Sequence, residues 1–286
     1  MDVLDRIKRL TITALVADEV LMGMLVLKGG NAIDIAYDMS SRGSIDVDFS
    51  MEKDFSEQGL ERIRSQMSEL LNQEFSREEF HVFDIKFYQQ PEVINDAVKS
   101  FWGGYCLDFK VIEFVKYELY KDNIGAMRNH AIVISGNNST KFSVDISRYE
   151  YVADKRPKEI EGNVVYVYSP EMIAIEKLRA LCQQNSDYKS VVKSMTPKSR
   201  ARDFYDIHNL VTAFRLDLSS EANKELCRHI FDAKRVPLAY LSQLAEQYEL
   251  HRQSWYSVES TVNQNEELQE FDFYFDFVLK QAALIG

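Results

Sequence analysis

The fold is decided by residues 42–49, which read Arg-Gly-Ser-Ile-Asp-Val-Asp-Phe. Apolar and acidic residues alternate from Ile45 to Phe49, and this alternation predicts a β-strand. Residues two apart on a strand project from the same face, so the carboxylates of Asp46 and Asp48 should point the same way. Magnesium offsets the repulsion between them, because its preferred ligands are hard oxygens. A solvated strand edge without a metal is the alternative interpretation.

A third carboxylate lies on another predicted strand. Residues 141–147 alternate between polar and apolar side chains, and Asp145 is flanked by apolar neighbours. If this strand lies beside the first, Asp46, Asp48 and Asp145 converge on a two-metal site. Such a site aligns an attacking hydroxyl with a leaving pyrophosphate. The alternative is an edge-strand aspartate that faces water.

A pair of glycines lies upstream, at a predicted strand-to-helix junction. Residues 25–27 predict a short buried strand, and Asn31 is a candidate N-cap for a helix over residues 32–37. Glycines such as Gly29 and Gly30 let a phosphate approach backbone N–H groups, and a helix N-terminus adds positive partial charge. Two glycines are also common in ordinary turns. The pair indicates a phosphate-binding loop only because a strand with paired carboxylates follows it.

A predicted helix farther along the chain places a lysine on its apolar face. The helix begins at Ser169, a capping residue, and Pro170 occupies its first turn. Lys177 shares one stripe with Ala174, Leu178 and Leu181. Its ammonium therefore either snorkels to solvent or reaches a bound triphosphate.

The next predicted helix, over residues 200–214, repeats this feature with an acid. Asp203 shares a face with Ile207, Leu210 and Phe214. One interpretation is an ion pair between Lys177 and Asp203 that ties the two helices together, and such a pair could be structural and functional at once. Asp206 lies one turn farther and could pair with Arg202 at i,i+4 spacing.

Strands mixed with helices in the first part of the chain give way to helices in the second. We expect an α/β or α+β domain over residues 1–168 and an all-α domain over residues 169–286. Helices are predicted at residues 3–21, 32–37, 57–73 and from 169 onward. Strands are predicted at residues 25–27, 45–49, 81–87, within 105–117, 131–135, 141–147 and 163–168.

Composition excludes several classes of protein. The 286 residues include 45 acidic and 34 basic side chains, so the net charge of −11 argues against a broad nucleic-acid-coating surface. One local basic run, residues 189–202, could still contact RNA, or it is a solvated loop and helix entry. No apolar run approaches the length of a membrane span, and the N-terminus lacks the order of a secretion signal. Three scattered cysteines indicate neither a metal quartet nor a disulfide framework. We therefore expect a soluble, cytoplasmic protein with no membrane partner.

Four motifs taken together resemble the AbiEii-type nucleotidyltransferases, which include toxins of abortive-infection toxin–antitoxin pairs and the related MenT toxins. The resemblance implies a DNA polymerase β-like nucleotidyltransferase fold for the mixed front domain. The motifs are Leu27-Lys28-Gly29-Gly30-Asn31-Ala32, Arg42-Gly43-Ser44-Ile45-Asp46-Val47-Asp48-Phe49, Glu176-Lys177-Leu178-Arg179-Ala180 and Arg202-Asp203-Phe204-Tyr205-Asp206-Ile207.

The resemblance also implies roles for residues. Asp46 and Asp48 would be metal ligands and catalytic residues for Mg²⁺ (or Mn²⁺), with Asp145 as a third metal ligand suggested by the general fold. The nucleotide would be bound by Gly29, Gly30, Asn31, Ser44 and Lys177. Lys177 would also be catalytic, because it would offset the charge that builds toward the leaving pyrophosphate. Asp203 would be the essential acid of the last motif, as a base or as a group that orients the acceptor. Asn31 departs from the family, in which a hydroxyl residue is usual there.

The activity implied is transfer of a nucleotide from a nucleoside triphosphate to an acceptor such as the 3′ end of tRNA. The protein would act as a toxin or phage-defence effector held in check by a cognate antitoxin. Two other classes stay open. A binding module for nucleotide or antitoxin would be stabilised by ligand without releasing pyrophosphate. A metal-dependent phosphohydrolase would release free phosphate or nucleoside.

Overall fold

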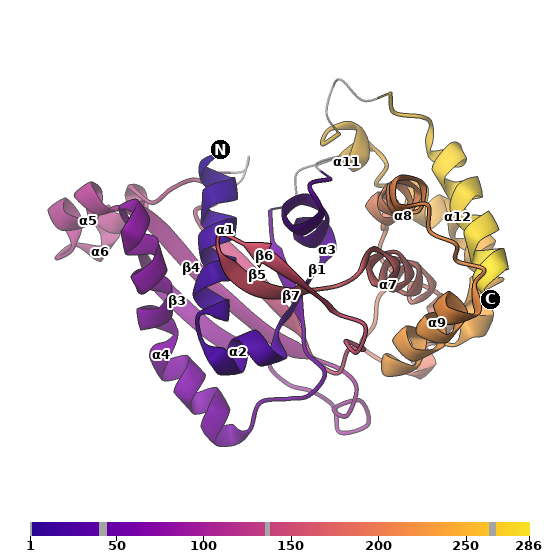
Figure 1. The fold of residues 1–286 in the computed structure, drawn as a ribbon, viewed down its shortest axis with the longest axis horizontal. Helices are drawn as coiled ribbons and strands as arrows, with labels where there is room; N and C mark the ends of the chain where they lie inside the picture. Colours follow the sequence, from indigo (N-terminus) through magenta and orange to yellow (C-terminus); the bar gives the residue numbers. More distant parts are fainter. Residues whose placement is uncertain (1, 40–44, 135–137, 263–266) are drawn as a thin grey trace. The chain divides into compact units, whose positions relative to one another are not determined.

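The computed structural model describes residues 2–39, 45–134, 138–262 and 267–286 (Figure 1). The chain divides into two compact units, which are described separately. The first comprises Met1–Asp38, Ser44–Ile94 and Gly103–Val167. The second comprises Met39–Gly43, Asn95–Trp102 and Tyr168–Gly286. The segment Asn95–Trp102 thus belongs with the C-terminal helices, although strands of the first unit precede and follow it.

A mixed seven-stranded sheet forms the first unit, in the order β3-β4-β5-β2-β1-β7-β6. Parallel pairing joins β2 to β5 and β1 to β7, and the other neighbours are antiparallel. The strands are β1 (Val26–Lys28), β2 (Val47–Ser50), β3 (Phe80–Gln90), β4 (Gly104–Glu113), β5 (Phe142–Ser147), β6 (Arg156–Ile160) and β7 (Asn163–Val167). The mixed sheet that the sequence predicts is therefore present.

One face of this sheet carries the apolar core. Phe109 of β4 lies opposite Phe142 of β5, and Phe109 also meets the ring of Phe75 edge-on. Helix α4 (Glu57–Phe75) packs against β3 and against α1 (Val3–Val16), as Figure 1 shows. Because side chains alternate along a strand, the residues between these aromatic positions point to the opposite face. The polar side chains of the candidate site lie on that opposite face.

Several predicted elements differ from the observed ones. The helix expected over residues 3–21 is two helices, α1 and α2 (Glu19–Met24), because the carboxylate of Asp18 caps α2 by accepting from Val20 and Leu21 N–H. The strand expected at residues 131–135 is wrong, since residues 131–134 form no strand. The strand within 105–117 ends at Glu113. It is followed by α5 (Phe114–Tyr120) and α6 (Ile124–Asn129).

Helices make up the second unit. Ser169 caps the first of them, accepting from Met172 N–H at 3.2 Å. Phe204 packs against His251, Phe271 and Phe275 in a buried aromatic cluster. The helices are α7 (Pro170–Cys182), α8 (Ala201–Phe214), α9 (Glu221–Ala233), α10 (Tyr248–Arg252), α11 (Tyr256–Glu259) and α12 (Phe271–Ile285). Among the described residues, no helix combines the length and apolar character that crossing a membrane requires.

Candidate functional site

Two of the three predicted carboxylates lie directly opposite each other on the polar face of the sheet. Strands β2 and β5 are parallel neighbours, and their register places Asp48 across from Asp145. Asp46 lies one residue before β2, in a bend rather than on the strand that the sequence predicts. Asp48 is half-buried, whereas Asp46 and Asp145 are exposed. We call these three residues the acidic edge.

Negative charges repel each other within the acidic edge. Although Asp46 is exposed, nearby protein atoms partly remove water from its carboxyl group and so raise its pKa, and the negative charge of Asp145 raises it further. The positive charge of Lys141 acts in the opposite direction and lowers the pKa. The charge of Asp145 therefore lies close enough to disfavour the ionised form of Asp46.

The donor chemistry of the acidic edge suits a hard divalent cation, because carboxylate oxygens are the ligands that Mg²⁺ and Mn²⁺ prefer. A cation would also offset the repulsion between Asp46 and Asp145. Within residues 2–39, 45–134, 138–262 and 267–286, however, no group of three or more His, Cys, Asp or Glu side chains is arranged to hold a metal ion. Binding by all three acids would require their side chains to turn toward a common point.

The first glycine of the pair makes room for Asp48. Gly29 has φ +69°, which is in the left-handed region that disfavours other residues. A Cβ atom at Gly29 would lie 2.7 Å from Oδ2 of Asp48, too close for an ordinary contact. Lys28 lies opposite Asp48 on β1, and its ammonium group donates to Ser147 Oγ at 3.3 Å. The glycine therefore allows the Asp48 carboxylate to lie against the backbone of the β1-to-helix turn.

Asn31 has a different local role from the predicted N-cap. The helix begins earlier, as α3 (Gly29–Asn31), and continues through a π-helical turn at Ala32–Ala36. The fully buried Asn31 side chain makes no cap and instead donates its Nδ2 hydrogen to the carbonyl oxygen of Asp46. This bond fixes the backbone of one candidate metal ligand. Ser44, the remaining predicted nucleotide-binding residue, lies outside the described residues.

The polar face continues beyond the acidic edge, with residues that the sequence reasoning missed. Asp108 of β4 is buried and lies opposite Ser143 of β5. Its Oδ1 accepts from Ser143 Oγ at 2.7 Å and from Cys106 Sγ at 3.3 Å. Its Oδ2 accepts from Tyr88 OH at 2.9 Å and from Lys141 Nζ at 3.1 Å. The sequence offered one signal for this cluster: Cys106 and Asp108 lie two residues apart on an apolar strand, so their side chains share one face.

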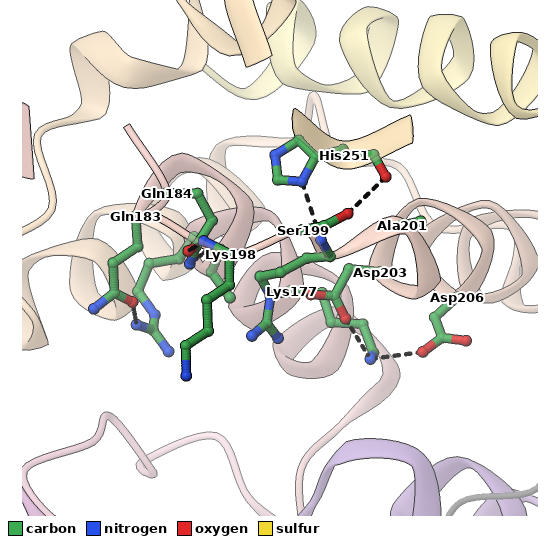
Figure 2. Close-up of polar contacts among 12 residues, drawn as sticks. Lys177, Gln183, Gln184, Lys198, Ser199, Ala201, Asp203, Asp206 and His251 are labelled. Atoms are coloured by element: carbon green, nitrogen blue, oxygen red, sulfur yellow. Dashed lines mark hydrogen bonds and ion pairs between the residues drawn. The ribbon is translucent and has the colours of Figure 1, made fainter. Parts of the chain in front are cut away.

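In the second unit, the predicted ion pair between Lys177 and Asp203 is present. The Nζ atom of Lys177 on α7 lies 3.1 Å from Asp203 Oδ1 and 2.7 Å from Asp206 Oδ2, both on α8 (Figure 2). Arg200 contacts the other oxygen of Asp203. Lys177, Asp203 and Asp206 are all buried. Lys177 therefore does not snorkel to solvent, and it holds α7 and α8 together through two carboxylates.

A buried histidine supports the start of α8. The Nδ1 atom of His251 accepts from the backbone N–H of Arg200 at 3.1 Å (Figure 2). Nε2 is therefore the protonated nitrogen, and it faces Gln247 Oε1 at 3.2 Å. The backbone carbonyl of His251 accepts from Ser199 Oγ at 2.8 Å. Burial lowers the pKa of His251 to about 4. The sequence reasoning missed this residue because its partners are distant in the sequence.

The predicted basic run has two kinds of members. Lys189, Lys193 and Lys198 are exposed. Arg200 contacts Asp203, and Arg202 donates from Nε to Ser257 Oγ at 3.3 Å. The three exposed lysines are therefore the better candidates for contact with a polyanion.

The chain was compared with protein families, curated proteins and solved structures. The family model described as "Nucleotidyl transferase AbiEii toxin, Type IV TA system" matches residues 13–277. The crystal structure of JHP933 from Helicobacter pylori is similar over 99% of this chain and 90% of that chain, with 17% identity and a TM-score of 0.48. An antigenic nucleotidyltransferase-like protein from Paracoccidioides brasiliensis is similar over 80% and 93% of the two chains, with 14% identity and a TM-score of 0.34. Among curated proteins, none matches the chain.

Proposed function

The chain belongs to the AbiEii family of nucleotidyl transferase toxins and is a nucleotidyltransferase; from this membership we propose its metal, substrates and site. It uses Mg²⁺ or Mn²⁺ to transfer a nucleoside monophosphate from a nucleoside triphosphate to an RNA acceptor such as the 3′ end of tRNA. It acts in the cytoplasm as a toxin or phage-defence effector, held in check by a cognate antitoxin. In this proposal, the first unit would be the polymerase β-like domain of such an enzyme.

The observation that carries the proposed site is the register of β2 and β5. It places Asp48 opposite Asp145, and Asp46 is close enough to be destabilised by the charge of Asp145. These three side chains would hold the metal, which supplies positive charge to the α-phosphate and lowers the pKa of the attacking hydroxyl. Gly29 and Gly30 would form the loop on the triphosphate side, and Gly29 leaves room for the Asp48 carboxylate.

The residues of the second unit have supporting roles in this proposal. Lys177 would contact a phosphate group, and Asp203 would be the essential acid that orients the acceptor. The ion pairs of Lys177 with Asp203 and Asp206 hold its ammonium group in one orientation. Asn31 would act through the backbone of Asp46 rather than as a cap.

The test is incubation of the protein with Mg²⁺, each α-labelled nucleoside triphosphate and total RNA, followed by gel electrophoresis. Label should move with an RNA band, and free phosphate or nucleoside instead would indicate a phosphohydrolase. Asp48→Asn should reduce transfer at least about 100-fold, because a metal ligand is lost. The matched control is Glu52→Gln, an exposed carboxylate just after β2. Retained transfer by a folded Asp48→Asn protein would refute the metal assignment.

A further inference from the structure

Lys141, the residue just before β5, interacts with two sets of acidic side chains in the first unit. On one side it donates to Asp108 Oδ2 at 3.1 Å. On the other side, the positive charge of Lys141 favours the ionised form of Asp46. The negative charge of Asp145 favours the protonated form of Lys141. The hydrogen bond to Asp108 is the larger cause of the raised pKa of Lys141. Lys141 is thus a protonated lysine beside the acidic edge.

The carboxylate of Asp108 accepts hydrogen bonds from groups other than Lys141. Each of its oxygens already has another donor, Ser143 Oγ for Oδ1 and Tyr88 OH for Oδ2. Burial opposes ionisation of Asp108, but the hydrogen bonds outweigh it and leave its pKa below the usual value. Asp108 is therefore an ionised carboxylate that donors other than the lysine also hold in place.

The ion pair instead restricts the position of Lys141. Its side chain is 55% exposed, so the pair adds little to stability, as is typical of partly solvated ion pairs. An ammonium group has three N–H donors, and Asp108 accepts from one of them. Two donors remain for another ligand, on a side chain that is largely open to solvent. A restrained and accessible cation at this place suits an anionic ligand such as a phosphate, which lysine binds as a point charge.

We propose that Lys141 binds a phosphate oxygen of the incoming nucleoside triphosphate, and that Asp108 is a positioning residue that holds Lys141 for this contact. This inference rests on the proposed function, since it takes the triphosphate to lie at the acidic edge. Asp108 itself is not a metal ligand, because its two oxygens accept from Ser143, Cys106, Tyr88 and Lys141.

The experiment compares Lys141→Met and Lys141→Arg with the control Lys110→Met. Lys110 is a nearby lysine whose Nζ bonds a neutral hydroxyl, Thr140 Oγ1, at 2.9 Å. The ligand is the α,β-methylene analogue of the triphosphate that the wild-type protein incorporates, and its binding with Mg²⁺ is measured by calorimetry. Lys141→Met should weaken binding roughly tenfold to a hundredfold, as expected for a lost charge-assisted hydrogen bond. Lys141→Arg should stay within about threefold of wild type, and Lys110→Met should bind as wild type does.

A double-variant comparison tests the positioning role. Asp108→Asn should weaken analogue binding in the wild-type background but have little further effect in the Lys141→Met background. A merely structural role for Asp108 would give the same loss in both backgrounds. Thermal unfolding of each variant identifies any that fail to fold, and in that case Lys141→Gln and Asp108→Ser replace them.

The outcomes separate this inference from the proposed function. If the wild-type protein incorporates no triphosphate, the proposed function fails and the role of Lys141 falls with it. If wild type is active and folded Lys141→Met binds the analogue normally, only the role of Lys141 is overturned. A change in the KM for the RNA acceptor, with unchanged analogue binding, would likewise overturn it.

Discussion

At the scale of single residues, His251 is a neutral side chain that folding protects from protonation. Its Nδ1 atom accepts the backbone N–H of Arg200, and a proton added there would remove that acceptor. Burial is the main cause of its lowered pKa, the charge of Arg200 lowers it further, and Asp203 opposes both. Because Arg200 and Asp203 belong to the polar cluster at the start of α8, protonation of His251 would disturb that cluster.

We predict that His251 makes the free energy of unfolding depend on pH. Its pKa is about 4 in the folded protein and about 6.5 in the unfolded chain. The unfolded state therefore binds more protons below pH 6.5, so stability is full above that pH and falls as the pH drops toward 4. At pH 5 the loss should be about 2 kcal/mol relative to pH 7.5.

Urea denaturation at pH 7.5 and pH 5 measures this loss. His251→Asn should flatten the dependence, since the amide oxygen of asparagine can accept from Arg200 without titrating in this range. His229→Asn, at an exposed position, is the control and should behave as wild type does. An equal pH dependence in wild type and His251→Asn would contradict the prediction.

At the scale of elements, buried ion pairs join α7 to α8. Lys177 contributes the cation from α7, and Asp203 and Asp206 contribute the carboxylates from α8. Removing one partner of a buried ion pair usually costs more than the pair contributes, because the remaining charge is stranded away from water.

We predict that Lys177→Met lowers the free energy of unfolding by about 3–5 kcal/mol. A second change, Asp206→Asn in the Lys177→Met background, should restore part of that loss by removing one stranded charge. Lys224→Met is the control, because its partner Glu221 is largely exposed and the loss should stay below about 1 kcal/mol. Urea denaturation followed by circular dichroism measures the free energy of unfolding of the three variants. If Lys177→Met costs no more than the control, the cluster has no structural role.

The elements also show which features local patterns can predict. Alternation predicts β5 because its apolar residues face a core and its polar residues face away from it. Edge strand β6 has no such signal, since its sequence Arg-Pro-Lys-Glu-Ile contains a proline and three charged residues. The pairing of Lys177 with Asp203 was predictable because both lie on apolar stripes. The Asp108 cluster gathers side chains from three strands, and only the strand order reveals that they meet.

At the scale of the whole molecule, a net charge of −11 restricts how an RNA acceptor can bind. Phosphate contacts must come from local groups of basic residues, because the overall charge repels a polyanion. Lys189, Lys193 and Lys198 are exposed members of the basic run and are candidates for these contacts. Each lysine that neutralises a phosphate of single-stranded RNA should add about 0.7 to the slope of log affinity against log salt concentration.

We predict that changing Lys189, Lys193 and Lys198 together to serine lowers this slope by up to about 2 and weakens acceptor binding. The control changes Lys99, Lys116 and Lys121 to serine. These lysines form surface ion pairs elsewhere, and their loss alters the net charge by the same amount. Acceptor affinity is measured between about 50 and 200 mM KCl, the range over which phosphate contacts weaken strongly. Equal slopes for the two triple variants would show that net charge, rather than this basic run, governs RNA binding. A smaller slope in the first variant alone would assign the RNA contact to residues 189–198 despite the acidic character of the molecule.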